Sequence, residues 1–173
     1  MKNATHLCLV SVALALSSGM AIAQESHTDV VDSDAIADAL TKPRTRGLTR
    51  AIGVSAKSKV DLNIPFEINS SELAPDAQRQ LAQLRDALSR DSLATLRIQI
   101  AGHTDSSGAA DYNRQLSERR ANTVMRYLID NGIEADRLEA VGYGEEMPLM
   151  TNDPGNPANR RVEIRNLGSS TEH

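Results

Sequence analysis

The sequence is poor in aromatic residues and has a single cysteine, and each scarcity excludes a class of protein. Among 173 residues there are one Phe, three Tyr and no Trp. A chain of this length suits one ordinary domain, so we do not expect a multidomain enzyme. The only cysteine, Cys8, lies near the N-terminus in an apolar segment. If that segment is removed, the protein has no disulfide, no thiol nucleophile and no thiolate ligand for a metal.

The apolar segment is typical of a secretory signal peptide. An apolar run from Leu7 to Leu16 follows Lys2, and small residues ending at Ala23 come after it. This order predicts a signal peptide over 1–23, cleaved after Ala23. A helix of about ten residues covers only half of a bilayer core, and no later apolar stretch approaches the required length. We therefore expect no membrane span and a protein that works outside the cytoplasm.

Charge divides the remaining chain into a leader and a longer acidic segment. Residues 24–40 carry five acidic residues and no base, and residues 41–59 carry six bases and no acid. From residue 60 onward there are 18 acidic residues, 12 Arg and no Lys. Nucleic-acid binding depends on neutralising phosphates, so this acidic segment argues against it. The basic stretch is the only candidate contact for a polyanion, and we favour its interpretation as a solvated linker.

The leader, residues 24–59, is interpreted as loosely docked on the rest of the chain. Residues 33–41 could form a short helix with Ser33 as its cap and with Ile36 and Leu40 on one face. Proline and glycine after this segment interrupt regular structure.

The pattern of apolar residues predicts four strands and two helices between residues 60 and 167. Alternation of apolar and polar residues indicates strands over 60–66, 96–100, 138–143 and 160–166. Helical spacing indicates one helix opened by Pro75 and one from about Ala110 to Asn131, ended by Gly132 in a left-handed cap. The order β-α-β-α-β-β predicts an α+β domain with helices packed on one face of a mixed four-stranded sheet. Residues 168–173 are expected to form a tail.

Polar residues gather where the second strand leads into the second helix. Gly102 and Gly108 bracket a loop in which backbone N–H groups and a helix N-terminus can hold an anion. Asp105 lies in this loop. One face of the helix that follows carries Asn113, Leu116, Ser117 and Arg120.

Asp105 and Arg120 have complementary chemistry for a zwitterion. A carboxylate can pair with an ammonium, and a guanidinium can bind a carboxylate with two parallel hydrogen bonds. Together they would hold an amine and an acid on one carbon. The alternative is that Asp105 and Arg120 pair with each other, and spacing alone does not decide between the two.

Five motifs in this segment carry a resemblance to a known family. They are Gly102-His103-Thr104-Asp105, Tyr112-Asn113, Leu116-Ser117-Glu118-Arg119-Arg120-Ala121, Gly142-Tyr143-Gly144-Glu145 and Asn159-Arg160-Arg161-Val162-Glu163-Ile164. In order and spacing they resemble the OmpA-like C-terminal domain, a family that includes the periplasmic parts of OmpA, the Pal lipoproteins and MotB. The segment 65–70 also resembles the family's first strand and following turn. Five linked motifs are far more specific than any one of them.

The resemblance implies an OmpA-like sandwich that binds peptidoglycan non-covalently in the periplasm of a Gram-negative bacterium. In the family, the matching Asp and Arg hold the diaminopimelate of the stem peptide, which assigns these roles to Asp105 and Arg120. The resemblance also places beside the ligand Thr104, Asn113, Leu116, Arg160, Asn69 and Ser70. It implies no cofactor and no metal. We expect a wall-associated protein and leave open whether it is also held near the outer membrane.

Two other classes of function remain as alternatives. In one, residues 24–59 bind a protein partner while the domain holds the wall, so that the protein is an envelope scaffold. In the other, which we favour least, the protein is a periplasmic hydrolase that uses His103, Asp105 and a neighbouring serine. A catalytic triad needs groups that converge from separate elements, and neither a G-x-S-x-G elbow nor an H-E-x-x-H metal motif is present. We therefore expect no catalytic residues.

Overall fold

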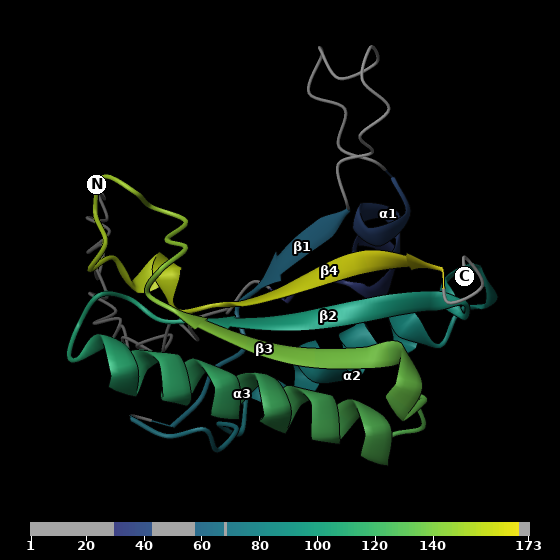
Figure 1. Cartoon of the computed structure of the whole chain (residues 1–173). Coiled ribbons are helices and arrows are strands. Elements are labelled where there is room, and N and C mark those ends of the chain that lie inside the picture. Colours follow the sequence, from purple (N-terminus) through teal and green to yellow (C-terminus); the bar gives the residue numbers. More distant parts are fainter. Residues whose placement is uncertain (1–29, 43–57, 68, 170–173) are drawn as a thin grey trace, which may run out of the picture.

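The computed structural model describes residues 30–42, 58–67 and 69–169. They form one mixed sheet with a layer of three α-helices on one of its faces (Figure 1). None of the described helices is long and apolar enough to cross a bilayer. The predicted signal peptide, most of the basic stretch and the last four residues lie outside the described part.

The sheet has four strands in the order β1-β4-β2-β3. The strands are β1 (Lys59–Leu62), β2 (Leu96–His103), β3 (Leu138–Gly144) and β4 (Val162–Ser169). β4 pairs antiparallel with both β1 and β2, whereas β2 and β3 are parallel. The mixed sheet and the α+β class that the sequence predicts are confirmed.

The two predicted helices are present as α2 (Ala77–Leu88) and α3 (Ala110–Asp130). Gly132 follows α3 with a φ of 94°, and the N–H of Ile133 donates to the carbonyl of Leu128 (3.0 Å), so the predicted left-handed cap is confirmed. Pro75 does not open α2 as expected. It lies in the preceding turn, and Asp76 is the N-cap residue.

Each predicted strand differs from the structure at one end or both, and β1 and β4 differ at both ends. β1 stops at Leu62, and Phe66 forms only an isolated bridge with Leu73. Pro65 separates them, and a proline cannot donate a hydrogen bond to a sheet. β4 begins at Val162 because a short 3₁₀ turn over Pro157–Asn159 precedes it, and β4 then continues to Ser169.

The helix that the leader could form is present as α1 (Ser33–Thr41). Its cap is Asp32 and not Ser33, since the Asp32 carboxylate accepts a hydrogen bond from the N–H of Ala35 (2.9 Å). Ile36 and Leu40 are completely buried in the main core. This part of the leader is therefore docked more closely than we expected.

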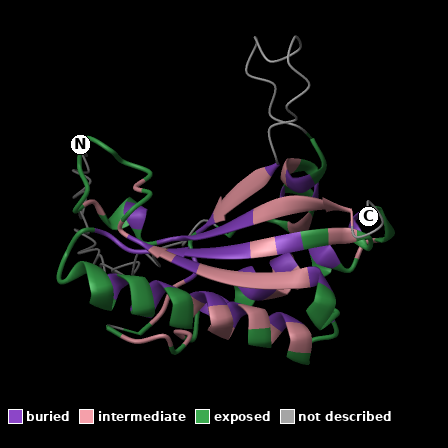
Figure 2. Cartoon of the chain, viewed as in Figure 1, coloured by how far each residue is buried: buried purple, intermediate pink, exposed green. Residues whose placement is uncertain are grey.

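The core fills the space between the helix layer and the sheet (Figure 2). α3 lies very close to the strands at Gly102 of β2 and Gly142 of β3. A Cβ on Gly102 would stand 2.2 Å from the carbonyl oxygen of Ser117, and one on Gly142 would stand 2.3 Å from the backbone nitrogen of Glu118. Both glycines are required because no side chain fits between strand and helix at these points.

We predict that Gly102→Ala lowers the free energy of unfolding by about 1–3 kcal/mol or more, because the helix backbone must move to admit the methyl group. Chemical denaturation measures the loss. Gly155→Ala is the matched control, since a Cβ there would approach only a side-chain oxygen of Asp153 at 4.0 Å. Equal stability of the two variants would contradict the close packing of α3.

Candidate functional site

The candidate site lies where β2 and β3 end and α3 begins. β2 and β3 run parallel, so their carboxyl ends meet at one edge of the sheet. The N–H of Thr104 donates to the carbonyl of Gly144 (2.9 Å), which ties the loop after β2 to the end of β3. The N–H of His103 donates to the carbonyl of Arg161 (3.0 Å), which ties it to the segment before β4. These bonds fix the position of Asp105 in the loop.

A pocket of about 420 Å³ opens at this edge. Its lining includes seven of the eight residues proposed from the sequence: Asn69, Thr104, Asp105, Asn113, Leu116, Arg120 and Arg160. The eighth, Ser70, borders it through its carbonyl oxygen, which accepts a hydrogen bond from Nε of Arg120 (2.9 Å). We call this pocket the large pocket to distinguish it from a smaller neighbour of about 240 Å³. A third pocket, lined by Asp61 and Leu149 among others, has about 460 Å³.

Sequence reasoning did not select four further residues of the lining: Phe66, Glu67, Ser107 and Tyr112. A signal for three of them was available. Phe66 and Glu67 belong to the segment that resembles the family's first strand and turn, and Tyr112 precedes Asn113 in a matched motif. The short turn before α2 is also held to the site, because the hydroxyl of Tyr112 donates to the carbonyl of Asn69 (3.4 Å). Asn69 itself has a φ of 53°, which an asparagine tolerates better than most residues.

The guanidinium of Arg120 is held in place but has no carboxylate partner in the described part of the chain. Its Cζ lies 4.9 Å from the centre of the Phe66 ring, and Nε donates to Ser70. Burial lowers the pKa of Arg120, and the nearby charge of Arg160 lowers it further. The terminal nitrogens of Arg120 are therefore suited to bind an anion in the pocket.

Asp105 pairs with Arg160 and not with Arg120. Nη1 of Arg160 lies 2.7 Å from Oδ2 of Asp105, while Oδ1 accepts a hydrogen bond from the N–H of Ser107 (3.0 Å). Burial alone would raise the pKa of Asp105, but the hydrogen bonds from Arg160 and Ser107 lower it, so the group is ionised at neutral pH. The alternative in which Asp105 and Arg120 neutralise each other is therefore not what the structure shows.

Asn113 holds the loop that carries Asp105. Its side-chain nitrogen donates to the carbonyls of Asp105 (3.3 Å) and Ser107 (3.1 Å) and to the carboxylate of Glu145 (2.6 Å). Thr104 differs, because its buried hydroxyl has no hydrogen-bond partner in the described part of the chain. A buried hydroxyl without a partner at the wall of a pocket is suited to receive a polar atom of a ligand.

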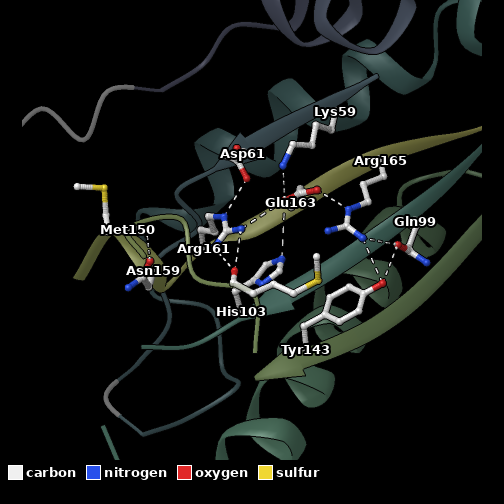
Figure 3. A network of polar contacts seen from close by, with 11 residues as sticks. Lys59, Asp61, Gln99, His103, Tyr143, Met150, Asn159, Arg161, Glu163 and Arg165 are labelled. Atoms are coloured by element: carbon white, nitrogen blue, oxygen red, sulfur yellow. Dashed lines mark hydrogen bonds and ion pairs between the residues drawn. The ribbon is translucent and has the colours of Figure 1, made fainter. Parts of the chain in front are cut away.

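A second polar cluster lies on the sheet face that none of the described helices covers, which we call the open face (Figure 3). At its centre the buried carboxylate of Glu163 accepts hydrogen bonds from Lys59 (2.9 Å), Arg161 (3.4 Å) and Arg165. Burial alone would raise the pKa of Glu163, but the hydrogen bonds from Arg165 and Lys59 lower it to about 2. Arg161 also pairs with Asp61 (2.9 Å). Arg161 and Glu163 are thus held in ion pairs on the sheet and do not line the large pocket.

His103 packs beneath this cluster and makes no hydrogen bond through its ring. The ring stacks on Tyr143 at 5.5 Å, and both ring nitrogens are buried without a hydrogen-bond partner in the described residues. Nε2 lies 3.9 Å from Oε2 of Glu163, a distance at which the two groups pair only if the histidine is protonated. Burial, assisted by the charge of Arg161, lowers the pKa of His103 to about 4. The hydrolase alternative gains no support, because no serine among the described residues is hydrogen-bonded to this histidine.

Comparison with known proteins identifies related sequences. The sequence model of the OmpA family matches residues 65–162. A peptidoglycan-associated lipoprotein of Pseudomonas putida is 46% identical over 103 residues, which cover 58% of this chain and 60% of that protein. The chain thus matches less than two thirds of this relative's length.

Solved structures share the same fold. A putative MotB-like protein from Desulfovibrio vulgaris is 34% identical, with a TM-score of 0.54 and coverage of 68% of this chain and 76% of the other. The cell wall anchor of the T6SS from Pseudomonas aeruginosa is 29% identical, with a TM-score of 0.55 and coverage of 65% and 82%. These matches confirm the predicted resemblance.

We predict that stability falls as the pH drops from about 6.5 to about 4. His103 stays neutral in the folded protein down to about pH 4, whereas in the unfolded chain it takes up its proton near pH 6.5. Its contribution is therefore fully present above pH 6.5 and is lost as the pH falls, by up to about 3 kcal/mol. Urea denaturation at a series of pH values measures how the free energy of unfolding changes with pH.

In the variant His103→Gln, the free energy of unfolding should no longer show the part of the pH dependence that His103 causes, even if the variant is less stable at every pH. Tyr143→Phe is the control, because it keeps the stacked ring and the histidine. A pH slope in His103→Gln equal to that of the wild type would show that other groups cause it.

Proposed function

Because this chain belongs to the OmpA family, with a domain homologous to the periplasmic domains of Pal, OmpA and MotB, we propose that it binds peptidoglycan non-covalently through the diaminopimelate of the stem peptide. The observation that carries the proposal is the large pocket, which has the ionised carboxylate of Asp105 and the unpaired guanidinium of Arg120 in one lining. Diaminopimelate in the stem peptide ends in an amine and an acid on one carbon. Each charge of this zwitterion finds an opposite charge in the pocket.

The other residues of the site have supporting roles in this proposal. Asn113 keeps the loop of Asp105 in place, and Ser70 and Phe66 keep Arg120 in place. Thr104 offers its unused hydroxyl, Leu116 supplies an apolar wall, and Asn69 shapes the turn that faces the ligand. The described aromatic residues of the pocket, Phe66 and Tyr112, are engaged with Arg120 and Asn69. The peptide, more than the glycan, is therefore the part of the wall that we expect to be recognised.

Family membership and the site also support a place in the envelope. We propose a wall-associated protein in the periplasm of a Gram-negative bacterium, without catalytic activity. The scaffold alternative keeps wall binding and adds a protein partner for the leader. Because α1 is packed into the core, such a partner would use the other residues of 24–59.

We predict that Asp105→Ala and Arg120→Ala each weaken binding to purified sacculi by about tenfold to a hundredfold, because each removes one charge partner of the ligand. Sedimentation with sacculi over a range of protein concentrations measures the affinity. Arg119→Ala and Asp111→Ala are matched controls, since both residues are exposed on α3 and neither lines the pocket. If both variants are folded and bind sacculi as tightly as the wild type, Asp105 and Arg120 are not the charge partners of the ligand.

We further predict at least about tenfold weaker binding to walls whose stem peptides contain lysine. Lysine has no second carboxylate for Arg120, so the guanidinium would stay unpaired in the complex. Competition between diaminopimelate-type and lysine-type wall fragments measures the preference. Arg120→Ala should bind both types equally, and a wild-type protein without preference would contradict the role of Arg120.

A further inference from the structure

The ion pair between Asp105 and Arg160 occupies the carboxylate that the ammonium of a ligand would bind. Both oxygens of the Asp105 carboxylate already accept hydrogen bonds, one from Arg160 and one from the N–H of Ser107. The side chain of Asp105 is only 9% exposed. An incoming ammonium therefore competes with the Arg160 guanidinium for the small exposed part of this carboxylate.

The side chain of Arg160 has fewer described contacts than that of Arg120. The side chain of Arg160 is 50% exposed, and its only described polar contact through the side chain is Asp105. Arg120 is fixed between Ser70 and the ring of Phe66. A half-exposed ion pair is a weak constraint, so a competing cation can replace Arg160 at small cost.

A smaller pocket lies next to the large one and is rich in positive charge. Its volume is about 240 Å³, and both pockets share Phe66, Arg120 and Arg160. The remaining residues of the smaller pocket are Asn63, Ile64, Pro65, His103 and Arg161. None of the described residues that line it is acidic. Arg161 is already neutralised by Asp61 and Glu163, which leaves Arg120 and Arg160 as the cations that can accept an anion.

The charge balance of the complex follows from this arrangement. When the zwitterion binds, its ammonium neutralises Asp105 and its carboxylate neutralises Arg120. Arg160 then loses its described ion-pair partner, and the described lining of the smaller pocket beside it contains no acidic residue. A ligand with one more carboxylate would restore the balance.

We propose that Arg160 changes partner on binding: the ligand ammonium displaces it from Asp105, and the released guanidinium takes up a second carboxylate of the ligand at the smaller pocket. This rests on the proposed function. In a stem peptide, the residue before diaminopimelate is a γ-linked glutamate, whose free α-carboxylate is the nearest anion of suitable chemistry. Arg160 is thereby a specificity-determining residue for this carboxylate.

The test compares two tripeptides, L-Ala-γ-D-Glu-meso-diaminopimelate and the same peptide with the glutamate α-carboxylate amidated. In both, the diaminopimelate carboxyl that bonds to the next residue of the stem peptide is amidated, so the glutamate α-carboxylate is the only group that differs. Isothermal titration calorimetry with the purified full chain measures both affinities. The wild type should prefer the carboxylate form by about tenfold or more. In Arg160→Gln the preference should disappear, and the amidated peptide should bind at least as well as to the wild type, because no internal cation competes for Asp105. Arg160→Lys should retain part of the preference.

Arg114→Gln is the matched control, because Arg114 pairs with Glu146 at the surface and lines neither pocket. Circular dichroism confirms that each variant is folded. Equal affinity of the wild type for the two peptides would overturn the proposal while leaving wall binding intact, and so would a preference that persists in Arg160→Gln. Failure of both peptides to bind the wild type would overturn the proposed function as well.

Discussion

The close contact between α3 and the sheet is the constraint on which the rest of the structure depends. Gly102 and Gly142 let the helix backbone lie directly on β2 and β3, and the hydroxyl of Ser117 completes the contact by accepting the N–H of Gly144 (2.8 Å). A helix placed in this way has no freedom to slide or rotate. Arg120 lies within one turn of the contact, so its position in the large pocket is set by the fit of backbone to backbone.

The site combines a fixed cation with an exchangeable one. Arg120 is held by a carbonyl and an aromatic ring, neither of which neutralises its charge, so its attraction for an anion is kept. Arg160 neutralises Asp105 in the free protein and prevents a buried carboxylate from standing alone. The ion pair between Asp105 and Arg160 thus stabilises the protein without ligand. A ligand with complementary charges can replace this ion pair.

The sequence predicts those parts of the fold and of the site that depend on local pattern. The strand and helix order follows from apolar periodicity, and Asp105 and Arg120 were found because one loop and one helix face carry them. The pairing of Asp105 with Arg160 joins residues 55 positions apart and depends on the strand order, which places β4 beside β2. The burial of Glu163 could not be predicted from periodicity either. The alternation of side chains along β4 places Glu163 on the open face, where it is buried only because the surrounding cations cover it. Such non-local features need the folded chain.

The ion pairs of the open face have a consequence for how the protein behaves among its own copies. Two sheets stack readily when each presents a flat apolar face, and such stacking is the start of fibril growth. Here Lys59, Arg161 and Arg165 lie across the strands around Glu163, so a second sheet could approach only by stripping water from charged groups. In the described part of the chain, the charges of the open face therefore oppose the stacking of one sheet on another.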